Sequence, residues 1–396
     1  MPAPARPSWY LFTALALVSI ISPVAIHMFM PALPAVRSDF GASVAAAQLT
    51  ISAVMFAMAF TTVLYGGLSD RFGRRPVLLA GLVLFTAGAA LCWFAADIGM
   101  LLAGRILQGA GAGCGIVLAR AIARDVYGMG RIAQEMAYLT AAYVMGPMLA
   151  PPLGGAMVSL FGWRSLFAFA AAWGVALIAL VLLIVPETAS PRGAGRAGMI
   201  GGYLRLLRRP RFTALALQPG LISGAFFAQA SASSFLAVET MGITAAEYGL
   251  WFLVFPCGFI LGNFVSGRLG ARRSVDAMVL LGAGAGVGCA AMLVAGMALF
   301  PGLVALFLPG FFISLAQGLC LPYAQAGAMA VDPDYAGTAS GAVVFSQMFF
   351  AALCQQLVGS FADGTWVPLG VVFSASCALS LAAALVARRH RPRGAA

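Results

Sequence analysis

The chain has 396 residues, of which 62% are hydrophobic and 9% are charged, and its formal net charge is +11. Soluble domains carry roughly a quarter of charged residues, so this composition excludes an ordinary soluble protein. The seven cysteines show no metal-ligand spacing, and the chain has neither a phosphate-binding loop nor a nucleophile–base pair. We therefore expect no enzyme, no ATP-driven pump, no bound metal and no cofactor.

Apolar segments that are long enough to cross a membrane recur along the whole chain. A helix needs about 20 such residues to span the hydrocarbon core. The first half predicts spans at 9–31, 43–67, 76–95, 98–122, 132–158 and 162–185, and the second half at 212–238, 245–267, 275–297, 301–326, 335–360 and 365–387. We predict an all-α membrane protein with two six-helix bundles, 1–185 and 212–396, joined by a cytoplasmic surface linker at 186–211.

The basic residues are distributed unevenly between the two sides that these spans define. The chain has no lysine, and 20 of its 23 arginines fall on one side. Only Arg37 and Arg164 fall on the other side, and Arg105 lies inside a span. Basic residues accumulate in cytoplasmic loops, so we predict a multi-pass protein of the bacterial cytoplasmic (inner) membrane with both termini in the cytoplasm. Topology in the lipid bilayer explains the charge of +11 without a nucleic-acid partner.

A motif repeats at half the chain length. Aligning Ser69 with Ser266, an offset of 197 residues, also aligns Arg71 with Arg268, and it matches a glycine and a further arginine in each segment. Transporters are often built from such repeats, with the substrate path between the halves. The repeat therefore predicts two pseudo-symmetric bundles and a transport function.

Three motifs carry a resemblance to a known family. The loop after the second span has Gly66, Asp70, Arg71, Gly73, Arg74 and Arg75, the fourth span has Arg105-Ile-Leu-Gln108-Gly, and the fifth has Gly146-Pro147 followed by Gly154 and Gly155. These runs resemble the loop 2–3, helix 4 and helix 5 motifs of the major facilitator superfamily. Local runs such as Met30-Pro-Ala-Leu-Pro34 are similar to its bicyclomycin/chloramphenicol-resistance group of drug:proton antiporters. The resemblance implies a major-facilitator-type fold of twelve helices.

The loop 2–3 residues predict a conformational latch. Asp70 could face the N-terminus of the eleventh helix, where a carboxylate is stabilised by about 0.3–2 kcal/mol. Arg74 or Arg75 could then pair with Asp125 at the end of the fourth span. The alternative is that these arginines only set the topology. Gly267 stands where the repeat would place a second aspartate, so a symmetric latch is not expected.

Two residues are candidates for proton coupling. A charge such as Arg105 inside a span costs about 2.5–3.5 kcal/mol on insertion scales and normally faces a partner or a water-filled cavity. The family resemblance implies coupling or substrate binding for Arg105, and the alternative is a structural contact with carbonyl groups of helix 1. His27 stands where the resembled group usually has an aspartate. Histidine can carry a proton near neutral pH, although it can equally serve as a neutral hydrogen-bonding residue.

The remaining candidates concern the substrate. No carboxylate is placed in the middle of a span, which favours a neutral, zwitterionic or anionic substrate over a lipophilic cation. Polar residues that could line the cavity, or could instead join helices, are Gln108, Tyr143, Gln229, Gln325 and Gln347. Pro147 removes a backbone hydrogen bond, and with its neighbouring glycines it could let helix 5 flex.

These features together predict a monomeric secondary exporter of a small organic molecule, working by alternating access and proton antiport, as in multidrug or antibiotic efflux. A dedicated exporter of a native metabolite, such as a metallophore or an amino-acid derivative, is the main alternative. An importer and a non-transporting membrane sensor or scaffold are the others.

Overall fold

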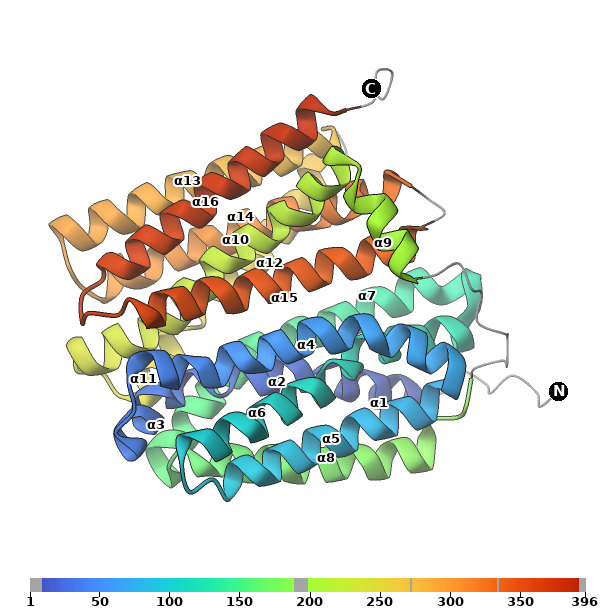
Figure 1. Ribbon diagram of the computed structural model, residues 1–396, viewed down its shortest axis with the longest axis horizontal. Helices are drawn as coiled ribbons and strands as arrows, with labels where there is room; N and C mark the ends of the chain where they lie inside the picture. Colours follow the sequence, from blue (N-terminus) through green and yellow to red (C-terminus); the bar gives the residue numbers. More distant parts are fainter. Residues whose placement is uncertain (1–8, 189–198, 271–272, 333–334, 392–396) are drawn as a thin grey trace. The chain divides into compact units, whose positions relative to one another are not determined.

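The computed structural model describes residues 9–188, 199–270, 273–332 and 335–391, and this part of the chain contains helices and no strand. Twelve of its helical segments are long and apolar enough to cross a membrane. In each of these segments, the mean hydropathy of an 18-residue window lies between 1.4 and 2.7. Such values are expected for helices whose outer faces contact lipid. The number of predicted spans is therefore confirmed. Figure 1 shows the helices of the described chain.

The chain divides into two compact units. The first comprises Met1–Ala42 and Ala53–Gly195, and the second comprises Ser43–Ser52 and Arg196–Ala396. The helices that begin in the first part of the chain are α1 (Trp9–Ser19), α2 (Ile21–His27), the 3₁₀ turn η1 (Met30–Ala32), α3 (Leu33–Phe40), α4 (Val44–Phe72), α5 (Arg74–Trp93), α6 (Ile98–Ala112), α7 (Cys114–Phe161) and α8 (Arg164–Ile184).

The second unit contains the remaining helices. These are α9 (Met199–Leu207), α10 (Pro210–Phe235), the π-helical turn η2 (Leu236–Thr240), α11 (Ala245–Trp251), α12 (Val254–Gly270), α13 (Val275–Leu299), α14 (Leu303–Ala330), α15 (Ala336–Ser360) and α16 (Val367–Arg389). The start of α4 also belongs to this unit. There, the Ser52 hydroxyl donates to Gln356 Oε1 at 2.7 Å, and Gln356 Nε2 donates to the Ala45 carbonyl at 3.2 Å.

Two predicted boundaries differ from the structure of the first unit. The expected first span, 9–31, is a broken helix that continues as α3 to Phe40. The fourth and fifth spans are confirmed as separate candidate spans, Ile98–Tyr127 and Tyr138–Phe161, but helical backbone continues from one to the other within α7, from Cys114 to Phe161. The polar segment between them keeps helical backbone geometry, because arginine and glutamate are good helix formers even though they interrupt the apolar pattern.

An ion pair joins the end of α3 to the start of α8 in the first unit. Arg164 Nη1 lies 2.8 Å from Asp39 Oδ2, and its guanidinium stacks on Trp163 at 4.3 Å. The Trp163 indole N–H donates to the same carboxylate at 3.1 Å. One of the few arginines expected on the outer side thus has a local charge partner.

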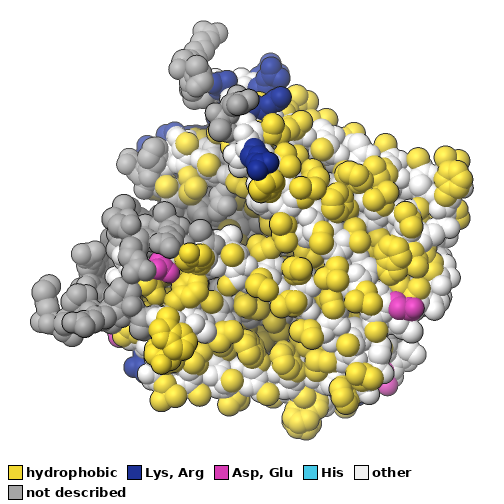
Figure 2. Space-filling view, turned by 180° about the vertical axis from the view of Figure 1, so that it is seen from behind, with side chains coloured by type: hydrophobic (Ala, Val, Ile, Leu, Met, Phe, Trp, Pro, Cys, Tyr) yellow, Lys and Arg dark blue, Asp and Glu magenta, His cyan; other side chains and the backbone are white. Residues whose placement is uncertain are grey.

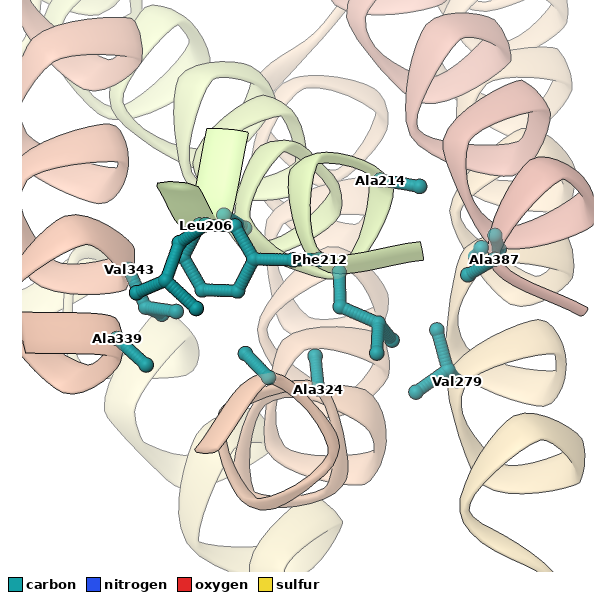
Figure 3. Close-up of a cluster of buried hydrophobic side chains, with 13 residues drawn as sticks. Leu206, Phe212, Ala214, Val279, Ala324, Ala339, Val343 and Ala387 are labelled. Atoms are coloured by element: carbon teal, nitrogen blue, oxygen red, sulfur yellow. The ribbon is translucent and has the colours of Figure 1, made fainter. Parts of the chain in front are cut away.

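The expected linker, 186–211, contains a helix that packs on the second unit. Helix α9 lies within it, and α10 already begins at Pro210. Leu206 of α9 is fully buried in a cluster of the second unit that includes Phe212 of α10, Ala339 and Val343 of α15, and Ala324 of α14 (Figure 3). Residues 189–198 lie outside the described part of the chain. Gly202 and Leu206 are buried and lie four positions apart, so they share the face of α9 that packs on the second unit.

Candidate functional site

The first helix is broken around His27. α2 ends at His27, and the 3₁₀ turn η1 begins only at Met30. Pro31 lies at the start of η1 and Pro34 near the start of α3, where proline disfavours a continuous α-helix because it lacks an N–H group and restricts the residue before it. His27 is 6% exposed, so the break places a titratable side chain inside the protein next to irregular backbone.

Arg105 of α6 holds the helix turn that precedes His27. Its Nη2 donates to the Ala25 carbonyl at 2.9 Å, and its Nη1 donates to Gln108 Oε1 at 2.6 Å. The guanidinium carbon lies 4.4 Å from the ring centre of Phe29 and 5.6 Å from that of Phe167. Arg105 is 1% exposed. Hydrogen bonds and aromatic faces therefore replace water around this charge, as expected if Arg105 has a structural contact with helix 1. The carbonyl group that Arg105 binds belongs to Ala25, two positions before His27 in the chain.

The glycines of the helix 5 motif allow α7 to pack closely against the broken first helix. A Cβ added to Gly146 would lie 2.4 Å from Pro23 Cβ, and one added to Gly154 would lie 2.1 Å from the Met28 carbonyl oxygen. Glycine is thus required at both positions for α7 to approach helix 1 of the same unit this closely. Pro147 lies inside α7 beside Gly146, and Gly155 follows Gly154 on the buried side of that helix.

Three of the predicted latch residues, Asp70, Arg74 and Asp125, form one network at the junction of α4 and α5. Arg74 is mostly buried, and its guanidinium pairs with Asp70 at 2.6 Å and with Asp125 of α7 at 3.1 Å. The same guanidinium donates to the Ser69 hydroxyl at 2.6 Å. Arg75 instead donates to the Leu182 carbonyl. Of the two arginines considered, Arg74 is therefore the one that joins Asp125.

The other residues of this motif have separate roles. Gly73 adopts a φ of +101°, a conformation that favours glycine, and it lets the chain turn from α4 into α5. Arg71 stacks on Phe72 at 5.1 Å. Gly66 has no atom within 4 Å of an added Cβ, so packing does not require glycine there.

Glu187 was not identified from the sequence. Its carboxylate accepts from the backbone N–H groups of Arg74 at 2.9 Å and Arg75 at 3.2 Å, at the N-terminus of α5. A carboxylate is favoured there because the first N–H groups of a helix lack intrahelical acceptors. Thr188 adds a hydrogen bond from its hydroxyl to Asp125 Oδ2 at 3.3 Å. The sequence signal available for this contact was the presence of an acid just after the sixth span. The N–H groups that it binds lie 113 and 112 positions earlier in the chain, so the sequence did not reveal the pairing.

The substrate-cavity candidates fall into two groups. Gln108 and Gln229 are buried and bind protein groups, since Gln108 accepts from Arg105 and Gln229 Nε2 donates to the Leu306 carbonyl at 2.7 Å. Tyr143, Gln325 and Gln347 are partly exposed. Gln325 donates to the Ser340 hydroxyl at 3.2 Å. Among the described residues, no group of three or more histidine, cysteine or acidic side chains could hold a metal ion.

Comparison with known proteins agrees with this architecture. A family model described as Major Facilitator Superfamily matches residues 15–354. The chain belongs to the major facilitator superfamily, whose members are membrane transporters and not enzymes.

Two relatives match most of the chain. An uncharacterized MFS-type transporter, YdgK, of Bacillus subtilis (strain 168) is 28% identical over 365 residues, which cover 90% of both chains. A bicyclomycin resistance protein homolog of Haemophilus influenzae is 25% identical over 394 residues, covering 96% of this chain and 97% of the relative. The multidrug resistance protein MdtL of Escherichia coli O45:K1 is 38% identical over 181 residues, or 46% of each chain.

Solved structures show the same fold at low sequence identity. A peptide transporter, POT, in complex with alafosfalin superposes with a TM-score of 0.79 at 15% identity, covering 98% of this chain and 96% of the other. The xylose transporter XylE from E. coli, in a partially occluded inward-open conformation, gives 0.74 at 13% identity, with 97% and 98% covered. The all-α fold with twelve membrane-spanning helices is therefore confirmed as that of a multi-pass major facilitator transporter.

Proposed function

We propose that this transporter exports a small organic molecule from the bacterial cytoplasm by alternating access, in exchange for protons. The observation that carries the proposal is the match over 96% of the chain to a bicyclomycin resistance protein homolog. The partial match to a multidrug resistance protein supports the same class of substrate. The arginine asymmetry supports an orientation in which the Asp70–Arg74–Asp125 network lies at the cytoplasmic side.

The proposed proton site is His27, and Arg105 positions it. The side chain of His27 is enclosed at the end of α2, and Arg105 fixes the Ala25 carbonyl two residues earlier. Protonation of a buried imidazole adds a charge to a low-dielectric region, so it favours any conformation that admits water or a counter-charge. Such a preference is what couples proton binding to a change of access.

The proposed latch is the Asp70–Arg74–Asp125 network. Arg74 joins the end of α4 to α7, and Glu187 fixes the backbone from which Arg74 projects. An arginine that binds two carboxylates and a hydroxyl is held in one direction. A side chain fixed in this way can stabilise one conformation of the transporter over another, and its loss is then expected to change turnover more than substrate affinity.

The proposed substrate is neutral, zwitterionic or anionic. Among the described residues, every carboxylate within a candidate span lies in the first or last turn of that span. A lipophilic cation would lose its hydration in the middle of the membrane without a compensating acid. Tyr143, Gln325 and Gln347 are the proposed hydrogen-bonding residues, because Gln108 and Gln229 already bind protein groups.

The experiment that tests the proposal is transport in proteoliposomes. The purified protein is reconstituted with an imposed pH gradient, and uptake of bicyclomycin and of neutral, anionic and cationic solutes is measured, with Asp70→Asn as the latch variant. We expect gradient-driven transport of at least one non-cationic solute, slowed in the variant. Transport that is indifferent to the gradient would contradict proton coupling, and transport restricted to cations would contradict the proposed substrate class.

A further inference from the structure

Helix α9 has three distinct faces. One face is buried, with Leu206 in the hydrophobic cluster of Figure 3 and Gly202 against the ring of Tyr335. The exposed side chains of Leu204 and Leu207 lie along one flank of this buried face, at helical spacing. Arg208 and Arg205 are exposed on the remaining side of the helix. The helix is thus anchored by one face and offers an apolar strip next to a cationic strip.

The anchoring is electrostatic as well as hydrophobic. Arg209 Nη2 lies 3.1 Å from Asp332 Oδ2, and Arg209 Nη1 donates to the Val331 carbonyl at 2.9 Å. Arg205 Nε lies 3.5 Å from the same Asp332 oxygen, and its guanidinium stacks on Tyr335 at 5.2 Å. One carboxylate therefore serves two arginines, and both guanidinium groups stay about half exposed.

The cationic strip carries more charge than the protein neutralises. Asp332 balances one of Arg205 and Arg209, and the side chain of Arg208 pairs with no carboxylate in the described part of the chain. Arg388 and Arg389 at the end of α16 add exposed positive charge to this end of the unit. In the space-filling view, arginine side chains gather at one edge beside a broad hydrophobic surface (Figure 2).

Helix α9 directly precedes a candidate membrane span. The helix ends at Leu207, and α10, a candidate span, begins at Pro210. Figure 1 shows α9 turning away from the start of α10 toward the start of α15. A helix at this level can keep its leucines among acyl chains and its arginines among headgroups.

We propose that α9 is a binding site for an anionic phospholipid of the surrounding bilayer. The phosphate would lie against Arg208 and Arg205, and the acyl chains would cover Leu204 and Leu207. Basic residues near a membrane surface bind anionic lipids by charge, and the apolar strip selects a lipid over a soluble anion. Because Asp332 and Tyr335 lie just before the start of α15, the bound lipid also stabilises the packing of α9 on that helix.

The test uses the full-length protein in detergent, with phosphatidylglycerol, phosphatidylcholine and inorganic phosphate as separate probes. Native mass spectrometry counts bound lipid, and thermal unfolding measures the stabilisation. We expect phosphatidylglycerol to bind and to raise the unfolding temperature, whereas phosphatidylcholine and phosphate have little effect. Arg208→Gln is expected to weaken phosphatidylglycerol binding about fivefold, the effect of removing one basic residue at an anionic surface.

Two further variants separate the site from general positive charge. Leu204→Ser with Leu207→Ser should weaken phosphatidylglycerol binding while leaving Arg208 in place. Arg273→Gln removes an exposed arginine that precedes α13 and is not on α9, and it should bind lipid as the parent protein does. Equal losses for Arg208→Gln and Arg273→Gln, or equal binding of the two lipids, would overturn the proposal. An equal response to free phosphate would replace the lipid with a soluble anion.

Discussion

Arg74 Nε lies 3.1 Å from Asp125 Oδ2, so a residue at the start of α5 is bound to a residue of α7 that is 51 positions further along the chain. The same guanidinium binds Asp70 and Ser69 at the end of α4. Three helices of the first unit therefore meet on one side chain. Among the described residues, the guanidinium of its neighbour Arg75 donates instead to a carbonyl of α8.

This difference predicts unequal effects at adjacent arginines. Arg74→Gln should lower the stability of the protein by about 2 kcal/mol, the loss expected for hydrogen bonds between charged groups, and should slow transport. Arg75→Gln should change either property by less. A thiol-reactive dye is a suitable reporter of unfolding, because six of the seven cysteines are buried and only Cys257 is exposed. Similar unfolding temperatures for both variants would show that the two arginines act through charge alone.

Arg105 is expected to tolerate lysine poorly. Its two guanidinium nitrogens bind Ala25 and Gln108 in different directions, and its flat face stacks on Phe29. An ammonium group has neither the forked arrangement of N–H donors nor the planar surface of a guanidinium group. Arg105→Lys should therefore reduce both thermal stability and transport, although the charge is retained. Arg273→Lys, at an exposed position just before α13, serves as the matched control and should behave as the parent protein does.

His27→Ala should abolish the dependence of transport on the pH gradient. If His27 carries the proton, its removal leaves substrate binding to a neutral solute largely intact but uncouples it from the gradient. His27→Asp restores a titratable group at the same position and should restore gradient dependence. The measurement is uptake into proteoliposomes with and without the gradient. Gradient-driven uptake by the alanine variant at the parent rate would place proton transfer elsewhere.

Gly154 and Gly66 predict opposite outcomes for the same substitution. Gly154→Ala would place a methyl group 2.1 Å from the Met28 carbonyl oxygen, so helix 1 or α7 must shift, and overpacking of this kind costs about 1–3 kcal/mol. Gly66→Ala meets open space and should be neutral or slightly stabilising, because alanine is the better helix former. The measurement is the thermal unfolding temperature of each variant. An unchanged unfolding temperature for Gly154→Ala would mean that helix 1 and α7 can separate to admit a methyl group without loss of stability.

The sequence predicted the spans well because hydrophobic length is a local property. It predicted the Arg74–Asp125 contact only as one of two alternatives, since Arg74 and Arg75 are adjacent and their directions depend on the turn at Gly73. The Glu187 contacts with the N-terminus of α5 could not be predicted, because they join segments that are far apart in the chain.

Helix breaks and continuations were also missed for physical reasons. The break after His27 depends on tertiary contacts from Arg105 and Gly154 as well as on Pro31, and the first two are not visible locally. The continuous helix α7 keeps its backbone hydrogen bonds through a polar segment that hydropathy treats as a loop. Helix α9 was assigned to a linker because its single buried leucine is too weak a signal without the helices α10, α14 and α15 against which it packs.

The ion pairs described above all have arginine as their basic member, since the chain contains no lysine. A guanidinium group keeps its proton at every pH at which a protein stays folded, so the cationic half of these contacts cannot be switched off by acidity or alkalinity.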